Sequence, residues 1–187
     1  MFEKLCIKTP KDLMQYFEDN FNYGFVYKNK IFTDMDPNFQ KNVDELYKIR
    51  LGKDFIKNKY GICWDFCEFE RLFFKEYNFE HECYFIDSCI NSVEDGPTHT
   101  FALFKQNNKW CWFEYSWSNH RGIWIYSSKE EALKDILFKF QKFYDNKLKD
   151  INIYKIDKVK KRLNAFEFVE HCLKGQKIIL DCKENVL

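Results

Sequence analysis

Apolar residues recur with the period of an α-helix in several stretches of the chain. The predicted helices span residues 10–21, 36–50, 63–77, 128–140 and 165–173. Residues typical of helix ends lie next to these boundaries. Thr9 before Pro10 is typical of a helix start, and Gly52 and Gly175 follow the predicted ends of the second and the last helix.

Short stretches rich in aromatic and β-branched residues predict strands between these helices. They span residues 83–86, 99–104, 109–117, 122–126 and 151–156, with a hairpin over residues 23–33. Residues 91–98, which include Asp95-Gly96-Pro97, predict a loop. Helices followed by consecutive strands and then further helices are typical of an α+β fold. The length fits a single domain over residues 1–187.

Asn107-Asn108 predicts the turn of a second hairpin, because asparagine tolerates the positive φ that a two-residue turn requires. In that register His99 and Glu114 face the same side of the sheet as diagonal neighbours. A carboxylate beside a histidine fixes the imidazole tautomer and stabilises the imidazolium. The pattern therefore indicates a histidine–carboxylate pair.

Cys63 begins the central predicted helix. Asp65 and Glu68 lie early in this helix and Arg71 and Lys75 lie late, an order that suits the helix dipole. The positive end of the dipole favours the thiolate, which is the nucleophilic form. A nearby histidine would complete the thiolate–imidazolium pair of cysteine hydrolases and acyltransferases. The alternative is that Cys63 is a small buried core residue.

Composition excludes several classes of partner. Lysine plus arginine (30) balance aspartate plus glutamate (29), so no broad field for nucleic acid is expected. The first residues lack the pattern of a signal peptide, and no stretch reaches the roughly 20 apolar residues of a membrane span. We therefore expect a cytoplasmic protein without membrane contacts, whose eight cysteines are reduced thiols.

A metal site is the main competing interpretation of the cysteines. Cys63, Cys67, His81 and Cys83 form a candidate zinc set, but their spacings differ from those of common zinc sites. We therefore predict no metal and no organic cofactor. The high aromatic content, 20% of residues, indicates a large aromatic core and offers side chains to line a pocket.

Three segments resemble motifs of the transglutaminase-like superfamily. The segment Tyr60–Phe66, Tyr-Gly-Ile-Cys-Trp-Asp-Phe, resembles the nucleophile motif, in which Gly-x-Cys-Trp opens the catalytic helix. His99 and the apolar strand after it resemble the histidine strand. The segment Lys109–Trp117 resembles the third motif, which ends in Asp-x-Thr-Trp. Glu114 and Ser116 stand where that motif has aspartate and threonine.

The resemblance covers about residues 53–126 and implies a small single-domain member of bacterial type with a papain-like core and helical flanks. Such a core packs the cysteine helix on an antiparallel sheet that carries the histidine and the acid. The resemblance implies that Cys63 is the nucleophile, His99 the general base and acid, and Glu114 the orienting carboxylate.

The implied reaction is attack on an amide of a peptide or protein substrate through a thioester, which water or an amine resolves. The backbone N–H of Cys63 is a candidate oxyanion donor. The second hypothesis is an inactive module of the same fold that binds a peptide in an aromatic cleft. The residues predict neither the substrate nor the oligomeric state.

Overall fold

The structure is a computed structural model that describes residues 1–89 and 96–180. Its helices are α1 (Pro10–Asn20), α2 (Phe39–Leu46), α3 (Lys53–Asn58), α4 (Cys63–Glu76), α5 (Lys129–Phe143), α6 (Ala165–Leu173) and the 3₁₀ turns η1 (Phe2–Leu5) and η2 (Ser118–His120). None of the helices in these ranges combines the length and the apolar character needed to cross a bilayer.

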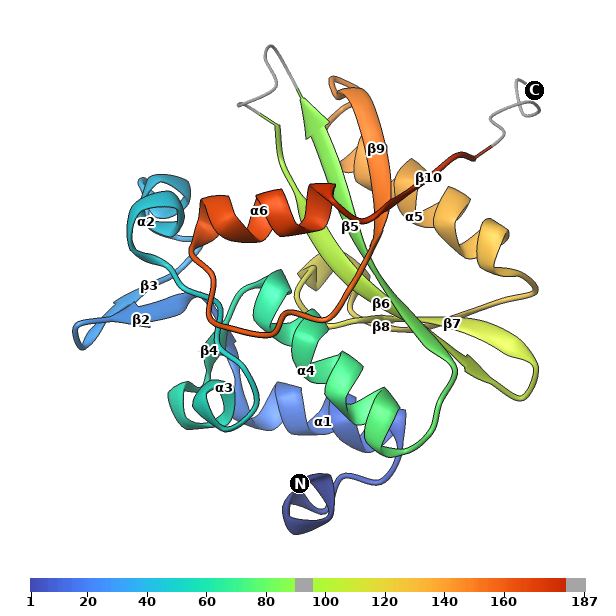
Figure 1. Ribbon diagram of the computed structural model, residues 1–187, viewed down its shortest axis with the longest axis horizontal. Coiled ribbons are helices and arrows are strands. Elements are labelled where there is room, and N and C mark those ends of the chain that lie inside the picture. Colours follow the sequence, from blue (N-terminus) through green and yellow to red (C-terminus); the bar gives the residue numbers. More distant parts are fainter. Residues whose placement is uncertain (90–95, 181–187) are drawn as a thin grey trace.

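A six-stranded antiparallel sheet forms the centre of the molecule (Figure 1), with the strand order β10-β9-β5-β6-β7-β8. Its strands are β5 (His81–Cys89), β6 (His99–Gln106), β7 (Lys109–Glu114), β8 (Gly122–Tyr126), β9 (Lys149–Ile156) and β10 (Gln176–Ile178). Two small sheets flank it. They pair β2 (Phe25–Tyr27) with β3 (Lys30–Phe32) antiparallel, and β1 (Asn22–Tyr23) with β4 (Tyr60–Gly61) parallel.

Each face of the central sheet carries its own hydrophobic core. On one face, side chains from β6 and β7 such as Phe104 and Phe113 pack with α1 and α4. On the other face, Phe101 and Trp112 pack with the apolar side of α5. The alternation along the strands explains the division, because successive residues point to opposite faces. The structure is therefore mixed α+β, with helices on both sides of an antiparallel sheet.

Most predicted elements are present, and the differences have local causes. The predicted boundaries of α6 and β8 are confirmed. The prediction that the second helix ends near Gly52 is wrong, because α2 ends at Leu46 and Gly52 precedes α3 with a φ of 52°. Of the predicted loop, residues 91–95 lie outside the described residues. The sequence did not predict α3, β10 or the β1–β4 pair.

Candidate active site

The β6–β7 hairpin has the predicted register. Gln106 pairs with Lys109 and Leu103 with Trp112, so the turn contains two residues. Both turn asparagines have positive φ, 52° and 60°. The turn chemistry therefore fixes the parity of both strands, and this parity places His99 at the start of β6 and Glu114 at the end of β7 on the same side.

His99 and Glu114 form a buried hydrogen-bonded pair. His99 Nε2 lies 2.7 Å from Glu114 Oε2, and the two residues are only 7% and 2% exposed. The other carboxylate oxygen, Oε1, accepts bonds from Ser116 Oγ at 2.9 Å and from the backbone N–H of Trp117 at 2.8 Å. The residues after Glu114 therefore fix the carboxylate that orients the imidazole.

Cys63 is the first residue of α4, as predicted, and Asp65 fixes this helix start. The Asp65 carboxylate accepts hydrogen bonds from the backbone N–H of Ile62 at 2.9 Å and of Arg50 at 2.6 Å. Gly61 lies so close to Phe55 that a Cβ would approach the ring to 2.4 Å. Gly61 and Asp65 of the Gly-x-Cys-Trp-Asp segment therefore fix the backbone that positions Cys63.

The Cys63 side chain lies near the His99 imidazole. Burial disfavours the charged ring, but the Glu114 carboxylate and the nearby Cys63 side chain outweigh it and raise the pKa of His99 to about 10. Since Glu114 occupies Nε2, the nitrogen that remains for the sulfur is Nδ1. The arrangement is therefore a linear series of thiol, imidazole and carboxylate.

The site lies at the start of β6 and the end of β7, between the core on the α4 face of the sheet and the core on the α5 face. Cys63 belongs to the core on the α4 face. The His99 ring stacks with Phe101 and Phe140 of the α5 face and contacts Trp117 edge-on, with ring centroids 5.5 Å apart. These aromatic contacts restrict rotation of the imidazole, so its two nitrogens keep their separate partners.

Tyr23 is a member of the site that sequence reasoning did not identify. Its strand β1 pairs with β4 through Tyr23 and Gly61, and Gly24 N–H donates to Gly61 C=O at 2.9 Å. Burial, followed by the Cys63 side chain, raises the pKa of the Tyr23 phenol well above its ordinary value, although the backbone N–H of Cys63 opposes this. The phenol therefore lies beside the start of α4 and keeps its proton.

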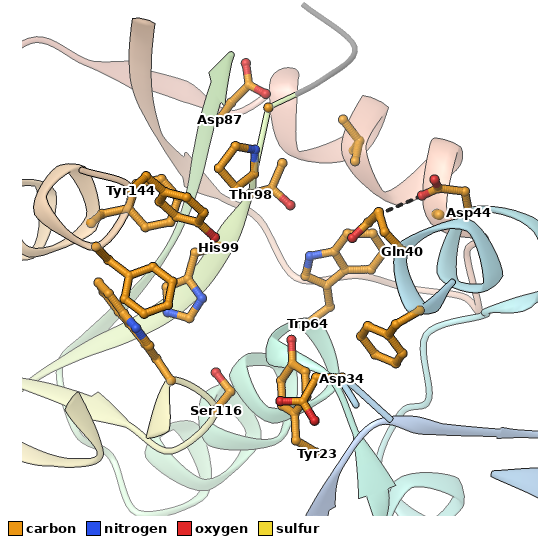
Figure 2. A pocket seen from close by; sticks show the side chains of 18 of the residues that line it. Tyr23, Asp34, Gln40, Asp44, Trp64, Asp87, Thr98, His99, Ser116 and Tyr144 are labelled. Atoms are coloured by element: carbon orange, nitrogen blue, oxygen red, sulfur yellow. Dashed lines mark hydrogen bonds between the residues drawn. The ribbon is translucent and has the colours of Figure 1, made fainter. Parts of the chain in front are cut away.

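A cleft with a volume of about 1250 Å³ opens beside these residues. Figure 2 shows His99 and Tyr144 on one side of the cleft and Trp64 and Gln40 on the other, with Tyr23 and Ser116 below. Trp64, which follows Cys63, stacks on Phe168 of α6 with the ring centroids 4.4 Å apart. Cys63 itself is only 6% exposed, so the surface of the cleft is formed by residues next to it.

Charged side chains of α4 are buried behind the site. Glu68 pairs with Arg71 at 3.0 Å. Glu70 is 2% exposed. Burial, followed by the nearby Glu114 carboxylate, raises the pKa of Glu70 well above its ordinary value. The sequence correctly predicted that these acidic residues lie early in α4. It did not predict that the sheet and neighbouring side chains would bury them.

The candidate zinc set does not assemble. Within residues 1–89 and 96–180, no three His, Cys, Asp or Glu side chains are grouped as metal ligands. The Cys83 thiol instead lies against the backbone C=O of Cys67 in the core, and His81 Nδ1 is 2.8 Å from the C=O of Phe79. Cys67 and Cys83 are therefore core thiols.

Comparison of the chain with protein-family models, with characterised proteins and with solved structures found no match.

Proposed function

We propose that the protein is a cysteine enzyme that attacks an amide or peptide bond, with Cys63 as nucleophile, His99 as general base and acid, and Glu114 as the orienting carboxylate. The observation that carries the proposal is the buried 2.7 Å bond between His99 and Glu114, with the Cys63 side chain close enough to the imidazole to help raise its pKa. This arrangement matches the three roles that thiol acyl transfer requires.

The chemical steps follow from the positions of these groups. His99 Nδ1 accepts the thiol proton, and the sulfur forms a bond to the carbonyl carbon of the amide. The imidazolium then returns that proton to the amine as the C–N bond breaks, which leaves a thioester on Cys63. Water gives up a proton to His99 and attacks the thioester; the C–S bond then breaks, and the imidazolium returns the proton to the Cys63 sulfur as the acid is released. An amine in place of water would yield a new amide.

We assign the developing oxyanion to two donors at the start of α4. The backbone N–H of Cys63, at the first position of the helix, has no acceptor four residues before it within the helix. The Tyr23 hydroxyl lies beside this N–H and stays protonated. Two donors at one point are the usual arrangement for stabilising a tetrahedral intermediate of acyl transfer.

We also propose that the fold is a transglutaminase-like variant of the papain core. The motif segments Tyr60–Phe66 and Lys109–Trp117 lie on a helix start and on a sheet strand, as the resemblance implies. The proposal includes a soluble cytoplasmic setting and a peptide or protein substrate.

One observation favours the alternative of a binding module without catalysis. Cys63 is 6% exposed and does not line the cleft, whereas Trp64 and His99 do. A module of this kind would bind peptide without forming a covalent bond. Formation of an acyl-enzyme on Cys63 distinguishes the cysteine enzyme from the binding module.

The experiment is a screen of activated esters and peptide amides with mass analysis of the intact protein. The wild type should gain the mass of the acyl group and release the amine, and Cys63→Ala should do neither. Cys6→Ala is the matched control, because Cys6 is an exposed thiol outside the site. Turnover that persists in Cys63→Ala, or that disappears in Cys6→Ala, would overturn the assignment.

A further inference from the structure

Carboxylates line the cleft on several sides. They are Asp34 after β3, Asp44 of α2, Asp87 of β5 and Glu170 of α6. No lysine or arginine is among the described residues that line it. The whole chain has 30 basic and 29 acidic residues, so the asymmetry belongs to the cleft and not to the composition. Figure 2 shows Asp34, Asp44 and Asp87 spaced around the cleft that contains His99.

Most of this negative charge is not neutralised within the protein. Glu170 forms an ion pair with Lys174 at 2.8 Å. Asp44 accepts a hydrogen bond from the neutral amide of Gln40 at 2.9 Å. In the described part of the chain no salt bridge reaches Asp34, Asp44 or Asp87. Burial raises the pKa of both Asp44 and Asp87, although Lys177 opposes the rise at Asp87 without forming a salt bridge.

Aromatic rings form the wall that faces these carboxylates. Trp117, Phe140, Phe143 and Tyr144 line it, and Phe143 is 49% exposed although it is large and apolar. Trp117 and Phe143 meet edge-on with centroids 5.6 Å apart. Ring faces attract ammonium and guanidinium groups, and they also pack along the apolar stems of lysine and arginine. The cleft thus offers both features that a basic side chain requires.

A second observation indicates that the ligand also carries hydrogen-bond acceptors. Trp64 is 4% exposed, and its Nε1 has no hydrogen-bond partner among the described residues. The indole lies in the cleft with this nitrogen on the side that faces His99 (Figure 2). A buried donor without an acceptor is costly, and a carbonyl oxygen of a bound peptide would satisfy it. Trp64 follows Cys63, so that carbonyl would lie close to the nucleophile.

We propose that the cleft binds a polypeptide segment with lysine or arginine side chains next to the amide that Cys63 attacks. The basic groups face Asp34, Asp44 and Asp87, their stems pack on the aromatic wall, and a backbone carbonyl accepts from Trp64 Nε1. The inference rests on the proposed function for the attack on the amide, but peptide binding itself requires no catalysis.

The test measures binding with Cys63→Ala, so that turnover cannot interfere. Fluorescently labelled peptides of one length carry lysine, arginine, glutamine or glutamate on both sides of a constant centre. Lysine and arginine peptides should bind about tenfold or more tightly than the glutamine peptide, the glutamate peptide should bind weakest, and added salt should reduce these differences. Equal affinities, or a preference for glutamate, would overturn the proposal.

A matched pair of variants tests which carboxylates are responsible. Asp44→Asn with Asp87→Asn should lower the ratio of lysine-peptide to glutamine-peptide affinity by about tenfold. The control is Asp19→Asn, because Asp19 accepts from Gln15 at 2.9 Å on α1 in the same way that Asp44 accepts from Gln40. An equal fall in the control would show a general charge effect and would refute a role for the cleft.

The same experiment separates this inference from the proposed function. If basic peptides bind selectively to Cys63→Ala but wild type never acylates on Cys63, the proposed function fails and the cleft assignment stands. If wild type turns over amides through Cys63 with no preference for basic neighbours, the cleft assignment fails and the proposed function stands.

Discussion

His99 and Glu114 lie 2.7 Å apart at adjacent strand ends, and the carboxylate oxygen that does not meet the imidazole accepts two further hydrogen bonds. Glu114, which stands where the similar motif described above has aspartate, is therefore held by hydrogen bonds at both carboxylate oxygens. Its extra methylene still permits direct contact with the histidine. The acid and the imidazole form one buried pair beside the Cys63 side chain.

Glu114→Gln should lower activity by about 10²–10⁴-fold while leaving the melting temperature close to that of the wild type. If the amide oxygen keeps the bonds from Ser116 and Trp117, its NH₂ group faces His99 Nε2. That nitrogen must then be an acceptor, which leaves the proton on Nδ1 and blocks removal of the thiol proton. Thermal unfolding and single-turnover acylation measure both effects. A large loss of stability with unchanged acylation would identify Glu114 as structural.

Tyr23→Phe should reduce kcat by about 10²–10³-fold with little change in KM, because it removes one oxyanion donor and leaves the ring in place. The matched control is Tyr27→Phe on β2, whose ring is 37% exposed and outside the cleft lining. Steady-state kinetics on the best amide from the screen provide the measurement. A rise in activity would instead mean that the Tyr23 hydroxyl obstructs the site.

Phe74→Ala should destabilise the protein by about 3–5 kcal/mol, since Phe74 is fully buried and its ring stacks on Phe104 with centroids 4.5 Å apart. Phe138→Ala on α5 is the control, because Phe138 is 62% exposed and the change should stay within about 0.5 kcal/mol. Urea unfolding of both variants measures the difference. Similar losses would mean that α4 does not form the core.

The titration of the Glu70 carboxyl should make the free energy of unfolding fall as pH rises. The folded state raises the pKa of Glu70 well above 4.5, so the stability gained from the protonated carboxyl is complete below pH 4.5 and is lost as pH rises through the higher folded-state value. Glu70→Gln removes this titration. Between about pH 5 and about pH 8 the variant should therefore lose less stability than wild type. Chemical unfolding at several pH values tests this, with exposed Glu130→Gln as the control expected to follow wild type. Parallel curves for Glu70→Gln and wild type would contradict the prediction.

Local chemistry explains which parts of the site the sequence predicts. The turn asparagines fix the β6–β7 register, and strand alternation then brings His99 and Glu114 to one face. The charge order of α4 correctly predicts that Cys63 begins the helix. Each of these signals lies within a short segment, so no knowledge of distant contacts is needed.

Long-range contacts account for what the sequence does not predict. Tyr23 reaches the site because the two-residue strands β1 and β4 pair in parallel, and strands this short carry no periodic signal. The burial of Glu70 depends on the sheet that covers α4. The acidic lining of the cleft comes from three separate regions of the chain, which are the segment with Asp34 and Asp44, strand β5 and helix α6.

The most direct test of the triad is the alkylation rate of Cys63 by iodoacetamide at about pH 6, followed residue by residue by mass spectrometry. At this pH His99 is an imidazolium, since its pKa is raised to about 10, and a cation beside a thiol increases its reactivity as a nucleophile. The exposed thiol of Cys6 is the internal reference, because it lies outside the site. We predict that Cys63 reacts about tenfold or more faster than Cys6, and that His99→Ala abolishes this advantage. Equal rates in the wild type, or a fast Cys63 that His99→Ala leaves unchanged, would contradict the account.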